Sequence, residues 1–233
     1  MMSGMSFLAP DAARAYWRTL LDNATKLIAD AHLLHSVGSF GRARALTVLA
    51  EEELGKATVV YERFSQSWSE RSSEPVELPL GSARDHLEKY RAAYEFGKEL
   101  EIFWGGGYEG HYPIDDDWDR WFAERKAEAN AAARAANLEK QRGFYVDLAE
   151  GKVLSPADFT SEGVGDPLVR AAQVIEMMLI TDHTRMQAGD PAHFDDTHEM
   201  QWRVMPTAHG EDFSEFMAQT RTRDPEPGDS QDD

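Results

Sequence analysis

Residues 42–64, RARALTVLAEEELGKATVVYERF, carry apolar side chains at the spacing of an α-helix. Large apolar residues recur mostly three to six positions apart and alanines fill places between them, at Leu46, Leu49, Leu54, Val60 and Phe64 and at Ala43, Ala50 and Ala57. A stripe of this kind needs other elements to cover it. The pattern therefore predicts a core helix against which the rest of the chain packs.

The same stretch places three acids, a glycine and a lysine in the middle of the predicted helix. Glu52 and Glu53 precede Lys56 by four and three residues, so a carboxylate and the ammonium share one side of the helix. Gly55 costs about 1 kcal/mol relative to alanine, which is tolerated more readily where another element or a ligand approaches the backbone. Two interpretations stay open, a functional charge pair and ordinary support of a solvated helix face.

Length and composition restrict the class of protein. With 233 residues, we expect one helical domain at 10–188 and a polar, partly disordered extension at 189–233. The absence of cysteine excludes disulfides, thiolate metal sites and cysteine nucleophiles. The chain shows neither a secretory signal pattern nor a run of about 18 apolar residues, so we expect a cytoplasmic protein without a membrane partner. A formal charge of −18 opposes general binding to nucleic acid.

Periodicity and turn signals predict an all-α antiparallel bundle. The expected helices span 10–35, 39–68, 82–104, 118–138 and 166–186. Ser82 is the predicted N-cap of the third helix, with Asp85 at the capping-box position. No helix is predicted after residue 186, although Trp202, Val204 and Met205 are a candidate docking patch.

The connecting segments are identified by composition. Residues 1–9 are expected to be an unstructured lead, and residues 69–82, rich in serine, proline and glycine, a loop. Residues 144–148 alternate like a short strand and are expected to lie across the helices, while EGK at 150–152 predicts a turn. The acids at 115–117 have the oxygen ligands that a divalent cation needs, but an acidic helix N-terminus explains them more simply. We therefore predict no metal and no cofactor.

Three stretches stand out by their order along the chain: LAEEELGKA at 49–57, DHLEKY at 85–90 and KQRGFYVDLAEGKV at 140–153. Together they resemble the AbiV family of bacterial abortive-infection proteins, within the HEPN superfamily, and the third stretch is the most specific. The resemblance covers about residues 12–186. It implies a compact helical bundle and a role in phage defence, in which an infected cell stops supporting phage production.

Many HEPN relatives are metal-independent ribonucleases that commonly act as dimers, with a signature of arginine and, after four to six residues, histidine. In this chain Arg203 and His209 match that spacing. Because Pro206 lies between them and no helix is predicted there, we interpret the match as chance. Whether the chain is an enzyme is thereby left open.

Carried onto the matching positions, the resemblance implies one set of candidate catalytic residues, which are Glu52, Glu53, Lys56, His86, Lys89, Lys140, Tyr145 and Asp147. In a ribonuclease, His86 or Glu52 would act on the attacking 2′-hydroxyl, and Lys56 or Lys89 would stabilise the charge on phosphorus. The alternative is a buried ion-pair network that locks the bundle.

Two functions follow from this set. The first is an anti-phage effector, or toxin, that acts on RNA or translation, although the basic residues that RNA binding requires are concentrated only at 120–142. The second is a non-catalytic helical module that senses or sequesters a phage or host protein. We also expect a homodimer through the apolar parts of the first and last helices.

Overall fold

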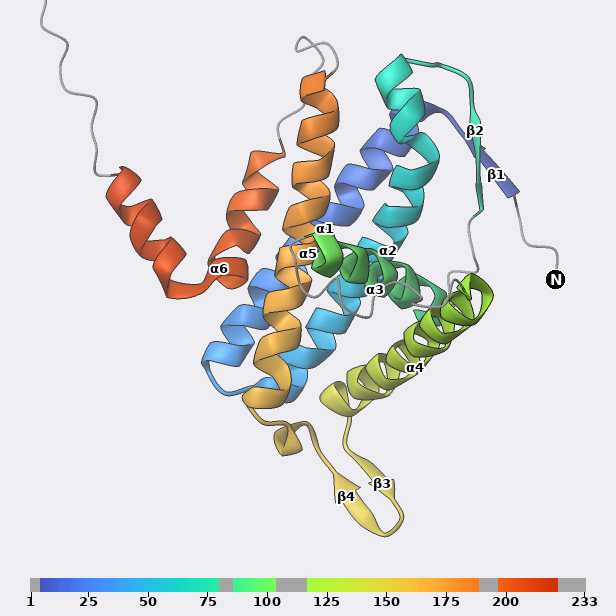
Figure 1. Cartoon of the computed structure of the whole chain (residues 1–233). Helices are drawn as coiled ribbons and strands as arrows, with labels where there is room; N and C mark the ends of the chain where they lie inside the picture. The colour runs from blue at the N-terminus through green and yellow to red at the C-terminus, as the bar shows by residue number, and fades with distance from the viewer. Residues whose placement is uncertain (1–4, 80–85, 104–116, 189–196, 222–233) are drawn as a thin grey trace, which may run out of the picture.

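The computed structural model describes residues 5–79, 86–103, 117–188 and 197–221. Within these residues the protein is a helical bundle, as the sequence predicts (Figure 1). Its helices are α1 (Pro10–Ser36), α2 (Phe40–Glu70), α3 (His86–Phe103), α4 (Trp118–Phe144), α5 (Glu162–Ala188) and α6 (His198–Arg221), with the short 3₁₀ helix η1 (Pro156–Asp158). Two antiparallel strand pairs accompany them, β1 (Met5–Leu8) with β2 (Val76–Pro79) and β3 (Asp147–Ala149) with β4 (Lys152–Leu154).

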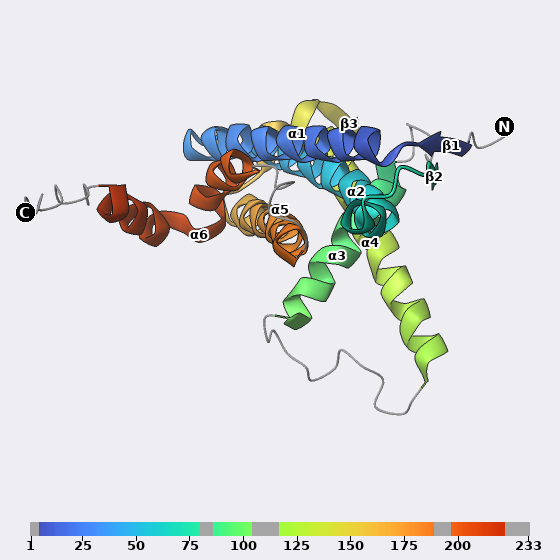
Figure 2. The same ribbon diagram turned by 90° about the horizontal axis from the view of Figure 1, so that it is seen from above.

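Helix α2 is the centre of the fold. It packs against α1, α3, α4 and α5, and α6 covers α1 and α5 from the other side (Figures 1 and 2). The core is filled by large side chains that are completely or almost completely buried, including Trp17, Leu21, Ile28, Phe64 and Ile175. Burial of each such side chain contributes about 1.5–3 kcal/mol, and these residues come from α1, α2 and α5.

Glycines set how closely the helices approach α2. A Cβ atom placed on Gly55 would lie 2.7 Å from the carbonyl carbon of Lys89 in α3, and closer still to its oxygen. A Cβ atom on Gly143 of α4 would lie 3.0 Å from the Cβ atom of Ala45 and closer to the carbonyl oxygen of Gly41. Because backbone atoms occupy both places, α3 and α4 can cross α2 at these distances only where the residue lacks a side chain.

Local signals explain several helix ends. Pro10 opens α1, where its missing N–H costs nothing. Asp117 is the N-cap of α4, and its carboxylate accepts a hydrogen bond from the backbone N–H of Arg120 at 3.0 Å. Asp117 therefore caps the N-terminus of α4, as predicted for an acidic helix start. Residues 115 and 116 lie outside the described part of the chain. Ser82 and Asp85, the predicted cap of α3, lie outside it as well.

The structure corrects several sequence-based predictions. Residues 5–8 are not an unstructured lead, and residues 76–79 are not loop, because these short segments pair as β1 and β2 and the side chain of Leu78 enters the core. Helix α4 continues to Phe144 and does not end at Leu138. Beyond residue 188 the chain forms α6, of which Met200, Val204 and Ala208 are buried. Val204 thus belongs to the core and not to a docking patch.

A further correction concerns the predicted extended segment. Strands β3 and β4 form a hairpin that projects from the end of the bundle, so it does not lie across the helices (Figure 1). Glu150 and Gly151 connect the strands with φ values of 50° and 76°, the left-handed conformation that a two-residue hairpin turn requires. The turn predicted at 150–152 is confirmed.

Two further features concern the helices themselves. Gly210, with φ 69° and ψ −158°, breaks α6, and the second part of the helix points away from the bundle (Figure 2). In the described parts of the chain, we find no helix with the length and the apolar character that crossing a membrane requires.

Candidate functional site

Three distant segments meet around the carboxylate of Glu52 on α2. The Nδ1–H group of His86, the first residue of α3, donates to Oε2 of Glu52 at 2.8 Å. The ammonium of Lys140, near the end of α4, donates to Oε1 of the same carboxylate. We call these three residues the Glu52 cluster. It joins the three stretches from which the site was predicted.

The packing of the helices explains why these residues meet. Gly55 lies one turn after Glu52 and lets the first turns of α3 lie directly on α2, so that His86 reaches the carboxylate. Lys140 reaches it because α4 remains helical beyond residue 138 and crosses α2. The close contacts at Gly55 and Gly143 thus place the residues from α3 and α4 on the same side of α2.

The cluster combines a buried pair with an accessible imidazole. The side chains of Glu52 and Lys140 are 7% and 12% exposed, whereas that of His86 is 46% exposed. While Nδ1 donates to Glu52, the lone pair of neutral histidine is on Nε2. The imidazole can therefore accept or deliver a proton at Nε2, and Glu52 holds the ring in one orientation.

The other predicted site residues are not all part of this arrangement. Lys56 pairs with Glu53 at 2.6 Å and not with Glu52, although both spacings fit a helix face. Lys89 contributes its backbone to the close contact with Gly55. Glu53 and Lys56 are on α2, and Lys89 is on α3.

Tyr145 and Asp147 are placed differently. Tyr145 follows the end of α4 and is 68% exposed, with its ring 6.4 Å from that of Phe144. The carboxylate of Asp147 accepts the backbone N–H of Leu148 at 2.8 Å. Tyr145 is the C-cap residue of α4, and Asp147 begins β3 of the hairpin that projects from the bundle (Figure 1). Among the described residues, neither Tyr145 nor Asp147 has a contact with the Glu52 cluster, so their part in the site stays a prediction.

A second polar group lies beside the first and was missed from the sequence. The guanidinium of Arg44 donates from Nε to Oε2 of Glu139 at 2.8 Å and from Nη1 to Oε2 of Glu51 at 3.3 Å. Arg44 is buried, and Tyr90 of α3 is buried next to it. One signal was available in the sequence: Arg44 precedes Glu51 by seven residues, which places the two on one helix face.

Burial perturbs this second group strongly. It raises the pKa of the Glu51 carboxyl, which Arg44 only partly offsets. Burial also raises the pKa of the Tyr90 hydroxyl, and the charge of Glu51 adds to that effect. Burial works to lower the pKa of Arg44, but the acids around it outweigh burial and raise it. Arg44 is therefore charged at every physiological pH, and Tyr90 is neutral.

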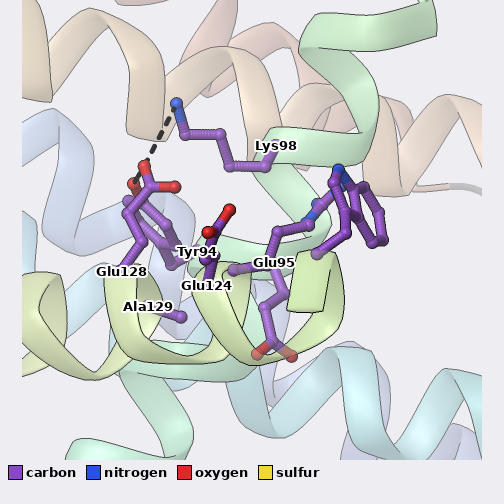
Figure 3. A pocket seen from close by; sticks show the side chains of 8 residues that line it. Tyr94, Glu95, Lys98, Glu124, Glu128 and Ala129 are labelled. Carbon is purple, nitrogen blue, oxygen red and sulfur yellow. Dashed lines mark hydrogen bonds and ion pairs between the residues drawn. The ribbon is translucent and has the colours of Figure 1, made fainter. Parts of the chain in front are cut away.

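Two pockets lie along α3. One, of about 210 Å³, lies between α2, α3 and α5 and is lined by Arg44, Glu51, Tyr90 and Arg170, among others. The other, of about 200 Å³, lies between α3 and α4. In it the hydroxyl of Tyr94 donates to Glu128 at 2.6 Å, and the ammonium of Lys98 lies 3.8 Å from the same carboxylate (Figure 3). Tyr94 and Lys98 line both pockets, so α3 separates them.

The Arg203 and His209 pair, interpreted from the sequence as lying outside any helix, is inside α6. Arg203 donates to Asp22 at 2.9 Å and to Thr25 at 2.8 Å, both on α1. His209 contacts the buried carboxylate of Glu176 on α5 at 2.7 Å through Nε2. The prediction that no helix forms at these residues was one reason to interpret the match as chance, and it is wrong. The other reason holds, because Pro206 lies between the two residues.

Comparison with known protein families identifies the family to which the chain is similar. The sequence model of the AbiV family, one of the HEPN families, matches residues 12–176. Neither the curated proteins nor the solved structures contain a match to this chain. The matched range runs from the first turn of α1 into α5 and includes the Glu52 cluster and the hairpin.

Proposed function

Since the chain belongs to the AbiV family of HEPN proteins, which suggests a role in abortive infection, we propose that it defends against phage by acting on RNA. The observation that carries this proposal is the Glu52 cluster, in which a buried carboxylate orients a half-exposed histidine. An oriented imidazole of this kind is the usual general acid–base group of enzymes that need no metal.

The proposed reaction is cleavage within the RNA strand. Nε2 of His86 takes the proton of a ribose 2′-hydroxyl, whose oxygen attacks the neighbouring phosphorus. The bond from phosphorus to the 5′-oxygen breaks, the products are a 2′,3′-cyclic phosphate and a 5′-hydroxyl, and the proton passes to the leaving oxygen. Lys56 and Lys89, on the same two helices, supply positive charge for the developing phosphorane. Glu52 is buried and acts through the imidazole, not on the RNA.

The test is an incubation of the purified full-length protein with total RNA and with transfer RNA, with and without extract from phage-infected cells. We expect cleavage by the wild type and a loss of at least about 100-fold in His86→Ala, in the range of general acid–base catalysis. Absence of cleavage under every one of these conditions refutes the proposed action on RNA.

The chain offers a closely matched control. His209 is 41% exposed and bonded to Glu176, which is 6% exposed, much as His86 is bonded to Glu52. His209→Ala therefore removes a similar histidine–glutamate contact at a different place, and we expect it to keep its activity. If His209→Ala loses cleavage while His86→Ala keeps it, the active site is on α6 and the role given to the Glu52 cluster is wrong.

A second candidate function, recognition of a phage or host protein without catalysis, is supported by the hairpin. Val146, Leu148 and Val153 are 67%, 69% and 68% exposed, and Leu148 pairs with Val153 across the strands. Such an apolar surface outside the bundle is typical of a binding site. A pull-down from infected cells that recovers no partner, together with RNA cleavage by the isolated protein, rejects this function.

The homodimer stays a proposal, and sedimentation at several concentrations tests it.

A further inference from the structure

Helix α4 carries an excess of cations in an acidic chain. Its sequence, WDRWFAERKAEANAAARAANLEKQRGF, has six arginines and lysines and four acids, whereas the complete chain has a formal charge of −18. Three of these acids lie on one side of the helix, and each has a cationic partner at 2.8–3.9 Å; they are Glu124, Glu128 and Glu139. These three carboxylates are therefore compensated and point away from the other side of α4.

The other side of α4 forms a strip that is poor in acids. Its side chains recur every three or four residues, are exposed or half-buried, and come from Phe122, Lys126, Asn130, Arg134, Asn137 and Gln141. We call these residues the α4 strip. Among the described residues, Lys126 and Arg134 have no hydrogen bond or ion pair. Asp119 is the one acid of α4 on this side, and it lies in the first turn, where the helix dipole stabilises a carboxylate.

Aromatic rings stand at the beginning of the α4 strip. The side chain of Phe122 is 60% exposed and that of Trp118 is 44% exposed, with their ring centroids 6.3 Å apart. The ring of Trp121 supports Phe122 edge-on, with centroids 5.0 Å apart and planes at 77°. Toward these residues, α4 extends away from α2 (Figure 2). Stacking of an unpaired base on such a ring raises affinity by about 5- to 150-fold.

The α4 strip leads from these rings to the Glu52 cluster. Phe122 and Lys140 are about five helical turns apart, so their side chains leave α4 in the same direction, about 27 Å from each other. Lys140 donates to the carboxylate of Glu52, which also holds His86. A strand that lies along the α4 strip therefore passes two cations without protein partners and reaches the proposed general base.

We propose that the α4 strip binds single-stranded RNA, an inference that rests on the proposed function and names its substrate class. Unpaired bases stack on Phe122 and Trp118, and phosphates lie beside Lys126 and Arg134. A duplex is a poorer ligand, because its bases are stacked on each other and cannot cover these rings. The acidic remainder of the chain repels RNA elsewhere and so favours this one surface.

Fluorescence anisotropy with the full-length protein measures binding separately from cleavage. The probe is a labelled RNA of about 12 nucleotides with methylated 2′-oxygens, which lacks the attacking hydroxyl and so cannot be cut by the proposed reaction. We expect the single strand to bind at least about tenfold more tightly than the corresponding duplex. Equal binding of the two, or no binding of the single strand at about 20 mM salt, overturns the proposal. Binding of this probe without cleavage of ordinary RNA would support the α4 strip and refute only the proposed reaction.

An apolar pair of variants tests the stacking. Phe122→Ala should weaken binding of the single strand by at least about fivefold. Leu138→Ala removes a side chain that is 55% exposed on the opposite side of the same helix, and should leave the affinity within about twofold. If Phe122→Ala keeps its affinity for RNA and instead loses a protein partner in a pull-down, the surface is a protein interface and the proposal is wrong.

A charged set of variants tests the phosphate contacts through their salt dependence. Each phosphate contact to a single strand contributes about 0.7 to the slope of log affinity against log salt concentration. Lys126→Gln and Arg134→Gln should each reduce the slope by about this amount, whereas Lys26→Gln, an equal loss of charge on α1, should leave it unchanged. Equal slopes in the wild type and all three variants refute the α4 strip, and circular dichroism of each variant excludes loss of fold as the cause.

Discussion

Gly55→Ala tests the packing on which the Glu52 cluster depends. In an isolated helix this substitution stabilises, because alanine is favoured over glycine by about 1 kcal/mol. Here the new Cβ atom would lie 2.7 Å from the carbonyl carbon of Lys89, whereas carbon atoms in contact prefer about 3.5–4.0 Å. Helix α3 must therefore move away from α2 by about 1 Å or more. The obstacle is backbone, which cannot rotate aside as a side chain can.

The expected cost follows from these two opposed effects. Overpacking costs about 1–3 kcal/mol, and contact with backbone places this case at the upper end. After subtraction of the helix-propensity gain, Gly55→Ala should destabilise the protein by about 2 kcal/mol. For a domain of this size, that lowers the melting temperature by about 4–8 °C.

The assay is urea unfolding followed by circular dichroism, with Gly165→Ala as the control. Gly165 is also helical, in α5, but a Cβ atom there would lie at an ordinary contact distance of 3.6 Å from Nε2 of His35. Gly165→Ala should therefore stabilise the protein by up to about 1 kcal/mol. If Gly55→Ala is as stable as the wild type or resembles the control, the proposed close contact of α2 and α3 is wrong.

Three further predictions concern charged groups. Lys140→Ala leaves the buried carboxylate of Glu52 without its lysine, so the free energy of unfolding in urea should fall by about 3–5 kcal/mol. The double variant Lys140→Ala with Glu52→Gln no longer buries that charge and should recover a large part of this loss. Because burial raises the pKa of Glu51, its contribution to stability is present below the ordinary value of 4.5 and is lost as the pH rises through the raised value. Glu51→Gln should therefore gain stability relative to the wild type as the pH increases from 4 to 8, and a constant difference would contradict this reasoning. Burial works to raise the pKa of Asp22, but hydrogen bonds and charges from Lys26 and Arg203 outweigh burial and lower it. The wild type should therefore be more stable than Asp22→Asn by less than about 1 kcal/mol above pH 3.8, the ordinary pKa of the group. This difference should disappear as the pH falls below that value, as urea unfolding at each pH would measure.

Helical periodicity was sufficient to predict most of the bundle. The apolar spacing of residues 42–64 identified α2 correctly, because a buried helix needs an uninterrupted stripe and no other pattern competes with it. Gly55 indicated a close approach before the partner was known, since glycine in a helix interior is otherwise unfavourable. The end of α4 was harder to predict, because the residues at 139–142 are all polar and do not continue an apolar stripe, whereas contacts such as that of Gly143 with Gly41 extend the helix to Phe144.

The sequence did not predict β1, β2 and α6, and the reason differs from that for α4. Segments of four residues such as 5–8 and 76–79 pair across about 70 positions, and nothing local specifies such a pairing. In α6, polar residues and Pro206 weaken the helical pattern, whereas contacts with the rest of the bundle, such as those of Arg203 with α1, favour the helix. Tertiary packing decided both cases.

For the candidate site, spacing identified the residues but not all of their partners. Glu52 and Lys56 have a spacing that fits a pair, but Glu52 instead contacts His86 and Lys140, 34 and 88 positions away. Spacing along one helix does not show where other helices cross it, and these crossings decide which partner Glu52 contacts. Arg44 was overlooked because a charged residue within an apolar stripe is usually at its edge, and here Glu139 and Glu51 compensate for its burial.

The hairpin of β3 and β4 is fixed at both of its ends. On the α4 side, Gly143 lies against the backbone of Gly41, and on the other side Pro156 lies so near to Gly41 that a Cβ atom there would be 2.8 Å from the Cα atom of Pro156. The first turn of α2 therefore packs against the residues on both sides of the hairpin and fixes its base. Because its strands are exposed and only its base contacts the bundle, substitutions at Leu148 or Val153 should leave the stability of the bundle unchanged.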